Sequence, residues 1–196
     1  MKTSEVSLAD QGSVGTLSPF LRRRRINDTK ICLRERGLDV GCGSGMHAGE
    51  IQPICYLGIE VDQLSLDSAI NQFPTHSFQE SLPKENEKFD TIISLAVIEH
   101  VKNSESFLAG LSKRLKPDTD ARIVITTPHP SMGWVHDLGA TVGLFSQHAS
   151  DEYEELFDHP KLELDGKKAA LRLVSYKRFI FGGNQLAVFA WKSLGV

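Results

Sequence analysis

The sequence predicts an α/β protein with a doubly wound, mostly parallel seven-stranded sheet and an antiparallel C-terminal hairpin at the edge. Apolar runs of strand length alternate with amphipathic stretches of helical length between residues 36 and 127. This alternation is typical of parallel strands joined by helices. A glycine-rich turn follows the first apolar run, and Gly182-Gly183-Asn184 separates two β-rich runs near the end, which indicates a hairpin. The succession is typical of a Rossmann-like fold.

Each element is expected from local patterning. Residues 1–18 are polar and are expected to form a mobile arm or a lid. Residues 20–35 place Phe20, Leu21 and Ile26 around the basic run Arg22–Arg25, which predicts a short amphipathic helix. Strands are expected at Arg36–Val40, Tyr56–Val61, Thr75–Gln79, Phe89–Val97, Ala121–Thr127, Leu171–Phe181 and Gln185–Trp191. Helices are expected at Gly45–Ile54, Leu64–Phe73, Ser104–Leu115 and Asp151–Phe157.

Length and composition predict one domain over residues 1–196, with 36–127 as its core, 128–160 as a lid and 171–191 as the hairpin. The chain is 40% apolar with a mean hydropathy of −0.20, which is ordinary for a globular protein. It has no stretch long enough to span a bilayer and no apolar leader near its start. The cysteines, Cys32, Cys42 and Cys55, lack C-x-x-C spacing, so we expect no structural metal site and a cytoplasmic location.

The run from Leu38 to Gly45, which reads LDVGCGSG, is the most informative segment. Glycines there permit positive φ and a close approach of backbone to a ligand. Glu60 closes the next apolar run, 19 residues after Gly41. An acidic residue about 20 positions beyond such a turn is placed to bind two ribose hydroxyls. The alternative is a tight strand–helix connection with no ligand, and His47 and Ala48 stand where a dinucleotide fingerprint would need its third glycine.

Four segments in order, LDVGCGSG, GIEVD, FDTIISLAVIEHV and LKPDTDARIVITTP, resemble the class I S-adenosylmethionine-dependent methyltransferases, in their small-molecule branch. The resemblance covers roughly residues 35–130 and implies S-adenosyl-L-methionine as cofactor. It implies that the turn binds the methionine moiety, that Asp39 faces its amino group, and that Glu60 and Val61 meet the ribose and adenine. The residues that it implies for cofactor binding are Asp39, Gly41, Cys42, Gly43, Ser44, Gly45, Glu60, Val61, Gln79, Glu80, Ser81, Leu82, Ser94 and Leu95.

Histidines after the fifth expected strand are the candidate catalytic residues. His129 stands between two prolines at the carboxyl edge of the sheet, and His148 is the second candidate, with His136 nearby. A histidine can take a proton from a hydroxyl or amine near neutral pH. The alternative is that each is an ordinary loop residue. Glu99-His100 can likewise be an acid/base pair, or Glu99 can face solvent or a neighbouring helix with His100 capping it.

The expected function is transfer of a methyl group from S-adenosylmethionine to an oxygen or nitrogen of a small-molecule metabolite. The alternatives are an RNA- or protein-modifying methyltransferase that docks through Arg22–Arg25, and a non-catalytic cofactor-binding subunit. Ser94-Leu95-Ala96-Val97 stands where nucleobase amino-methylating members carry N-P-P-[FY], and the net charge is −3. Both observations argue against a nucleic-acid partner.

Overall fold

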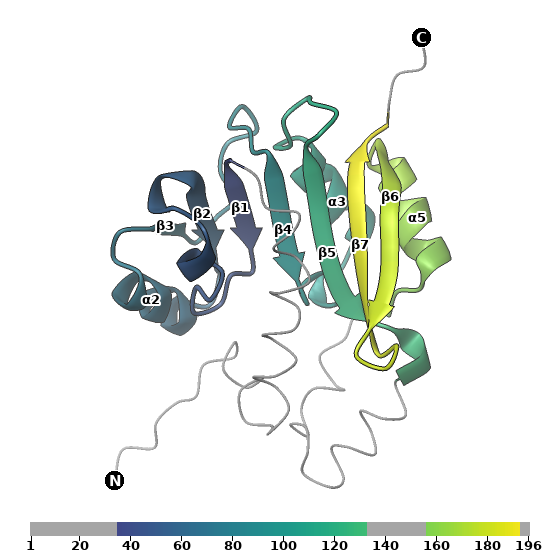
Figure 1. Ribbon diagram of the computed structural model, residues 1–196, viewed down its shortest axis with the longest axis horizontal. Coiled ribbons are helices and arrows are strands. Elements are labelled where there is room, and N and C mark those ends of the chain that lie inside the picture. Colours follow the sequence, from purple (N-terminus) through teal and green to yellow (C-terminus); the bar gives the residue numbers. More distant parts are fainter. Residues whose placement is uncertain (1–34, 133–155, 193–196) are drawn as a thin grey trace, which may run out of the picture.

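The structure, a computed structural model, describes residues 35–132 and 156–192. Seven strands form one sheet in the order β3-β2-β1-β4-β5-β7-β6 (Figure 1). The strands are β1 Gly37–Val40, β2 Tyr56–Ile59, β3 Ser77–Gln79, β4 Thr91–Leu95, β5 Arg122–Pro128, β6 Leu171–Phe179 and β7 Asn184–Trp191. The first five pair in parallel, while β7 pairs antiparallel with both β5 and β6. The predicted fold class is therefore confirmed.

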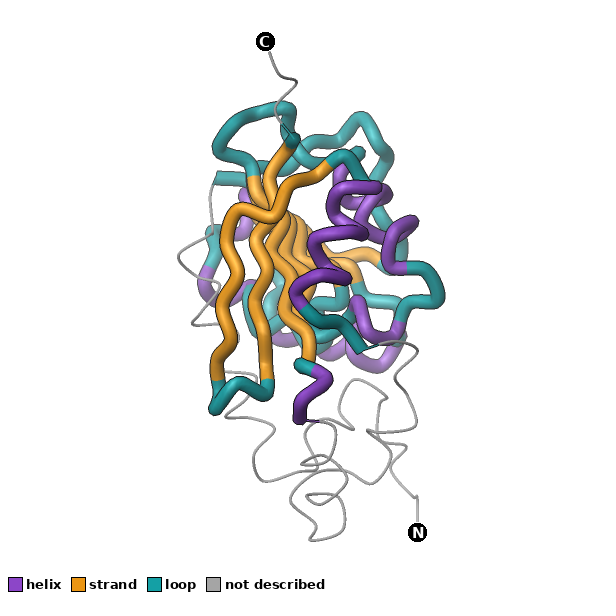
Figure 2. The backbone as a smooth tube through the Cα atoms, turned by 90° about the vertical axis from the view of Figure 1, so that its right-hand side faces the viewer, coloured by secondary structure: helices purple, strands orange, loops and turns teal. Residues whose placement is uncertain are grey.

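Helices cover the sheet and bury its apolar side chains. They are α2 Gln63–Gln72, α3 Ser104–Ser112 and α5 His159–Lys168. In Figure 1, α3 and α5 lie behind the β5–β7–β6 half of the sheet, and Figure 2 shows the helices beside the edge-on strands. Ile92 and Phe189 from the strands and Leu108, Leu111 and Leu162 from the helices are fully buried in one cluster. This cluster holds α3 and α5 against the sheet and so fixes the position of β5.

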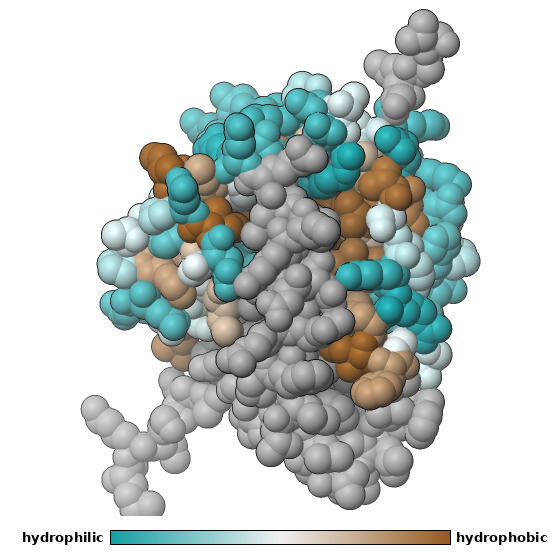
Figure 3. Space-filling model, in the orientation of Figure 1, coloured by the Kyte–Doolittle hydropathy of each residue, from teal (hydrophilic) through white to brown (hydrophobic). Residues whose placement is uncertain are grey.

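The opposite face of β5, β7 and β6 carries a second, smaller apolar cluster. Val124, Phe179, Leu186 and Val188 are buried there, with Val174 and Ile180 packed against them. Figure 3 looks onto this face and shows hydrophobic side chains over these strands beside grey atoms. Strands with apolar side chains on both faces are typical of the interior of a doubly wound sheet.

The helix α5 was not expected from the sequence. Its start has clear signals, because Asp158 accepts a hydrogen bond from the Lys161 N–H at 2.9 Å and Pro160 occupies the first turn. Its buried stripe, however, holds Leu162, Asp165 and Gly166 rather than a run of apolar residues. The Asp165 carboxylate is satisfied by the Ser104 hydroxyl at 2.6 Å. A buried stripe containing a carboxylate and a glycine has no helical apolar period.

The prediction of a helix at Gly45–Ile54 is wrong. Two short 3₁₀ turns stand in its place, at Ala48–Glu50 and Pro53–Cys55. Gly45 has φ of +80°, and Pro53 cannot continue an α-helix. The segment after the turn therefore offers no α-helix N-terminus to a ligand.

The C-terminal hairpin is confirmed, but its turn is not where Gly183 and Asn184 predicted it. The expected strand Leu171–Phe181 ends at Phe179, and Asn184 already belongs to β7. The left-handed residues are Ile180, Phe181 and Gly182, with φ of +52°, +53° and +82°. Two of these carry side chains that disfavour positive φ. The strand pairing, rather than local turn preference, imposes this conformation.

Replacing Phe181 by asparagine is expected to stabilise the protein. The Phe181 side chain is fully exposed, so its loss removes no packing, and asparagine tolerates positive φ much better. A left-handed residue costs about 1–2 kcal/mol, of which the substitution should recover about 1 kcal/mol. Urea unfolding followed by circular dichroism measures the change. Phe181→Ala is the matched control, because it removes the same side chain and keeps the strain; equal stability of both variants would contradict the prediction.

Several sequence expectations lie outside the described residues: the arm at 1–18, the Arg22–Arg25 run, most of the helix at 20–35, and nearly all of Asp151–Phe157. Phe157, which is described, is not helical. Within residues 35–132 and 156–192, no helix has the length and apolar character needed to cross a membrane.

Candidate active site

The glycine turn lies where the strand order reverses. The chain passes from β1 to β2 and β3 on one side and then returns to β4 on the other side of β1. Ligands of open α/β sheets bind at such a point, beyond the carboxyl ends of the strands. The turn begins at Gly41, immediately after β1. The topology therefore brings the ends of β1, β2 and β4 together around Gly41–Gly45 (Figure 1).

The glycines of the turn have different roles. Gly41, Gly43 and Gly45 all have positive φ, at +75°, +55° and +80°. A Cβ on Gly41 would lie 2.3 Å from Val97 Cγ2, so this glycine lets the turn pack against the segment after β4. A Cβ on Gly43 would meet no atom of residues 35–132 or 156–192 within 4 Å. Gly43 thus faces open space, which a ligand can enter close to the backbone.

Glu60 joins the end of β2 to the turn. One carboxylate oxygen accepts the Gly43 N–H at 2.8 Å, and the other accepts the Asp62 N–H at 3.0 Å. The side chain is nearly buried, at 7% exposure. Each oxygen keeps lone-pair capacity for a further donor. Val61, which follows, is 78% exposed beside it.

The segment after β3 contributes a half-buried border. Gln79 donates from Nε2 to the Ser81 carbonyl at 2.6 Å, which shapes the turn from β3. Glu80 and Ser81 are exposed, whereas Leu82 packs against the main core. The Glu60 N–H bonds to the Gln79 carbonyl at 3.1 Å, so this segment is tied directly to the acid.

The end of β4 holds polar groups and a strained residue. Ser94 is fully buried, and its hydroxyl has no hydrogen-bond partner among the described residues. Ala96, two residues on, has φ of +57°, which is uncommon for alanine. Its N–H bonds to the Thr126 carbonyl at 2.8 Å. Strain of this kind clusters at functional sites.

Glu99 and His100 follow in a 3₁₀ turn, Ile98–His100. Glu99 is buried at 1% exposure, while His100 is exposed. Of the two positions expected for a non-catalytic Glu99, facing solvent is therefore wrong, and facing a neighbouring helix is compatible with its burial.

Asp39 is held by residues that the sequence did not single out. Its Oδ2 accepts the Tyr56 hydroxyl at 2.9 Å, and His47 Nδ1 lies 3.3 Å from the same oxygen. All three side chains are buried. Burial first, and then the charges of Asp39 and Glu60, raise the pKa of the Cys42 thiol, so it stays protonated. Tyr56 begins a strand and His47 follows the turn, and nothing in their spacing marks them as partners of Asp39.

His129 lies just beyond β5, at the same edge of the sheet. Neighbouring strands are about 4.8 Å apart, so the end of β5 is roughly 10 Å from that of β1. His129 Nδ1 accepts the Ser131 backbone N–H at 3.1 Å and lies 2.8 Å from the Ser131 hydroxyl. Since a backbone N–H can only donate, the neutral ring carries its proton on Nε2. His148 and His136 lie outside the described residues.

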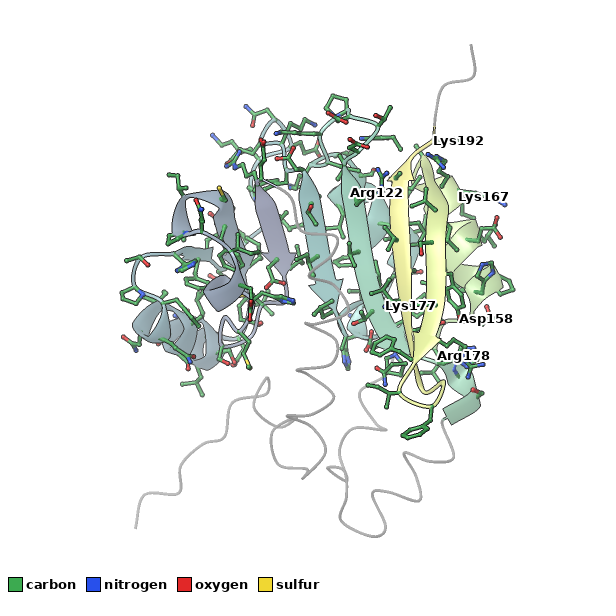
Figure 4. The ribbon with its side chains drawn as sticks, in the orientation of Figure 1. Arg122, Asp158, Lys167, Lys177, Arg178 and Lys192 are labelled. Atoms are coloured by element: carbon green, nitrogen blue, oxygen red, sulfur yellow. The ribbon has the colours of Figure 1, made fainter. Side chains whose placement is uncertain are left out.

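Arg178 of β6 completes this cluster. Its guanidinium donates to the Ser131 hydroxyl at 2.6 Å and to the Gly182 carbonyl at 2.6 and 2.9 Å. Figure 4 shows Arg178 at the end of β6 beside the hairpin turn. Partial burial and the Arg178 charge lower the pKa of His129, because both disfavour the imidazolium. His129 is therefore held in its neutral form at neutral pH.

Replacing Arg178 by glutamine is expected to raise the pKa of His129, because the nearby positive charge is removed. In the parent protein the value should lie below the usual 6.5. At pH values between this lowered pKa and the usual 6.5, the unfolded chain binds more protons than the folded one. His129 therefore destabilises the fold as the pH falls through this interval. Titration of the ring protons by NMR gives both values. Arg172→Gln on the same strand is the control, and an equal shift there would count against the assignment.

The arrangement fits an S-adenosylmethionine-type ligand. Gly43 offers an open cradle, the Ser94 hydroxyl lacks a partner, and two buried carboxylates stand at the turn. Among the described residues, no lysine or arginine forms an ion pair with Asp39 or Glu60. A cationic ligand with ribose hydroxyls would satisfy both acids.

Comparison with known proteins agrees with this geometry. The Rickettsia bellii ubiquinone biosynthesis O-methyltransferase is 36% identical over 89 residues, covering 41% of this chain and 37% of that protein. The Brucella ovis enzyme of the same name is 27% identical over 153 residues, covering 71% of this chain and 60% of that protein. The chain thus spans less than two thirds of the length of these curated relatives.

The fold is also that of solved methyltransferases. The magnesium protoporphyrin IX methyltransferase of Synechocystis, solved with bound S-adenosylhomocysteine, has a TM-score of 0.60 at 14% identity, covering 94% of this chain and 84% of that one. A model of the family described as "Methyltransferase domain" matches residues 16–174 of this chain. Because this match spans far more than half of the sequence, the protein belongs to the methyltransferase domain family, among the class I S-adenosylmethionine-dependent methyltransferases.

Proposed function

We propose that this protein transfers the methyl group of S-adenosylmethionine to an oxygen of a small molecule. The observation that carries the proposal is the closure of the glycine turn by Glu60, at 2.8 Å from the Gly43 N–H, beside open space over Gly43. The O-methyltransferase names of the curated relatives support oxygen as the acceptor atom. Nitrogen is the other acceptor that the sequence leaves open.

The chain's own residues would bind and orient the cofactor. The backbone of Gly41, Cys42, Gly43, Ser44 and Gly45 would surround its methionine part, and Asp39 would face the amino group. Glu60 and Val61 would meet the ribose and the adenine, Gln79–Leu82 would border the ring, and Ser94 and Leu95 would border the reacting end. The sulfonium supplies an electrophilic methyl group, so the protein's task is alignment and exclusion of water.

The acceptor would lie at the carboxyl edge near β5. We propose His129 as the residue nearest the acceptor atom, with His148 as the second. With Nδ1 engaged by Ser131, the neutral ring presents Nε2–H, which suits donation of a hydrogen bond to the acceptor oxygen. Removal of a proton by this ring would require Nδ1 to release the Ser131 N–H.

Composition supports a small-molecule partner and a cytoplasmic location for the protein. The net charge of −3 and the Ser94–Val97 sequence favour a small-molecule partner over a nucleic acid. Cys42 and Cys55 are free thiols, which supports a reducing cytoplasm.

Methyl transfer from labelled S-adenosylmethionine into separated fractions of a cell extract tests the proposal. We expect label in the small-molecule fraction, and analysis of the product should show the methyl group bound to oxygen. Label only in RNA or protein would overturn the small-molecule assignment. Binding of the cofactor product without any transfer would identify a non-catalytic subunit instead.

A further inference from the structure

The Asp39 carboxylate is held on one side only. Tyr56 Oη and His47 Nδ1 both contact Oδ2, at 2.9 and 3.3 Å. The described residues contribute no hydrogen bond to the other oxygen, Oδ1. Asp39 itself is 2% exposed, so bulk water reaches little of its surface. One half of a buried carboxylate is therefore kept for a donor that the described chain does not supply.

Packing of its ring holds the Tyr56 hydroxyl against Asp39. Its ring makes edge contacts with His76 and Phe78, each with centroids 5.6 Å apart, and the residue is 3% exposed. His76 is in turn anchored to the Ile51 carbonyl at 3.0 Å. Burial and the charge of Asp39 raise the pKa of Tyr56 far above its usual value, so the phenol keeps its proton and donates it.

The neutrality of this donor matters for a cationic ligand. A lysine or arginine at Tyr56 would fix Asp39 equally well and would cancel its charge. A phenol fixes the carboxylate and leaves the negative charge in place. The carboxylate can then attract an ammonium group in a poorly solvated site, where a charge-assisted hydrogen bond is strong.

We propose that Tyr56 and His47 are positioning residues that hold Asp39 Oδ2, so that Oδ1 is presented to the amino group of the cofactor's methionine part. The inference rests on the proposed cofactor site and goes beyond it, because it assigns a recognition role to two residues of β2 and the loop after the turn. They act through Asp39 and touch no reacting atom.

Calorimetric titration with two ligands tests the inference. S-adenosylhomocysteine carries the amino group, and 5′-methylthioadenosine keeps the adenosine and the sulfur without it. We expect Tyr56→Phe to weaken S-adenosylhomocysteine binding about 3- to 30-fold and to leave methylthioadenosine binding unchanged. In an Asp39→Asn background, Tyr56→Phe should cause no further loss, because the group through which it acts is gone.

Tyr176→Phe is the matched control. It also removes a tyrosine hydroxyl that donates inside the protein, to Gln185 Oε1 at 2.8 Å, but on β6, the edge strand that lies away from β1 and β2. Its affinity for both ligands should equal that of the parent. His47→Asn provides a second variant should Tyr56→Phe unfold, and it should show the same selective loss.

The possible outcomes distinguish a failure of the positioning role from a failure of the cofactor site. Equal loss of both ligands in Tyr56→Phe, no loss of either, or additive loss with Asp39→Asn would each overturn the positioning role while leaving the cofactor site intact. A parent protein that binds neither ligand would overturn the cofactor assignment and this inference together.

Discussion

Gly41→Ala is expected to destabilise the fold strongly. The new Cβ would lie 2.3 Å from Val97 Cγ2, and the backbone would have to keep φ of +75°. Left-handed strain costs about 1–2 kcal/mol and overpacking about 1–3 kcal/mol. The total of about 2–5 kcal/mol is from a seventh to all of the stability of a typical domain, which is about 5–15 kcal/mol. Urea unfolding measures the loss.

Gly43→Ala is the matched control for this prediction. It carries similar strain, with φ of +55°, but its Cβ would meet no atom within 4 Å in the part of the chain that the structure describes. The stability loss should be only about 1–2 kcal/mol. Cofactor binding should nevertheless suffer, because the methyl group would fill the open space over the turn. Partial recovery of Gly41→Ala by Val97→Ala would verify the clash, and equal stability of the two alanine variants would disprove it.

Glu60→Ala is expected to weaken cofactor binding more than any other single change at the ribose side. The substitution removes the acceptor of the Gly43 and Asp62 N–H groups as well as the proposed partner of the ribose. Loss of such a buried acceptor costs roughly 1–3 kcal/mol, or about 5–150-fold in affinity. Calorimetry with S-adenosylhomocysteine measures the effect.

Glu87→Ala controls for the loss of a negative charge. Glu87 pairs with Arg36 at 3.0 Å and is half exposed. Arg36 directly precedes β1, so this pair lies at the amino end of that strand, away from the glycine turn. Its removal should leave the affinity unchanged. If Glu60→Ala binds as tightly as the parent, the ribose assignment is incorrect.

The strands could be predicted because their signal is local. Phe89–Val97 and Ala121–Thr127 are apolar and β-branched, and the structure places β4 and β5 within or beside these runs. The glycine turn was also predictable, because few residues other than glycine tolerate its φ values. Which atoms these glycines would meet was not predictable, since Val97 lies 56 positions from Gly41 in the chain.

The remaining features depend on contacts between distant segments. The hairpin turn at Ile180 and Phe181 is imposed by the pairing of β6 with β7, against local preference. The helix α5 buries Gly166 because Phe189 of β7 lies where a Cβ would otherwise be, at 2.6 Å. Tyr56 and Asp39 meet because β1 and β2 are neighbours. From the sequence alone, a tyrosine in a strand is expected to pack in the core like an apolar residue, so its bond to Asp39 could not be predicted. The cofactor-binding roles of the individual residues stay predictions.

The position of β7 has a consequence for biosynthesis. The last of the described strands does not lie at the border of the sheet; it is inserted between β5 and β6 and is buried over Asn184–Ala190. A nascent chain still lacking this segment leaves β5 with an open edge and β6 with no neighbour at all. The sheet can therefore close only after residues 184–191 have left the ribosome. A premature stop anywhere before residue 184 would remove an interior strand, and the product would be a substrate for proteases rather than a shortened enzyme.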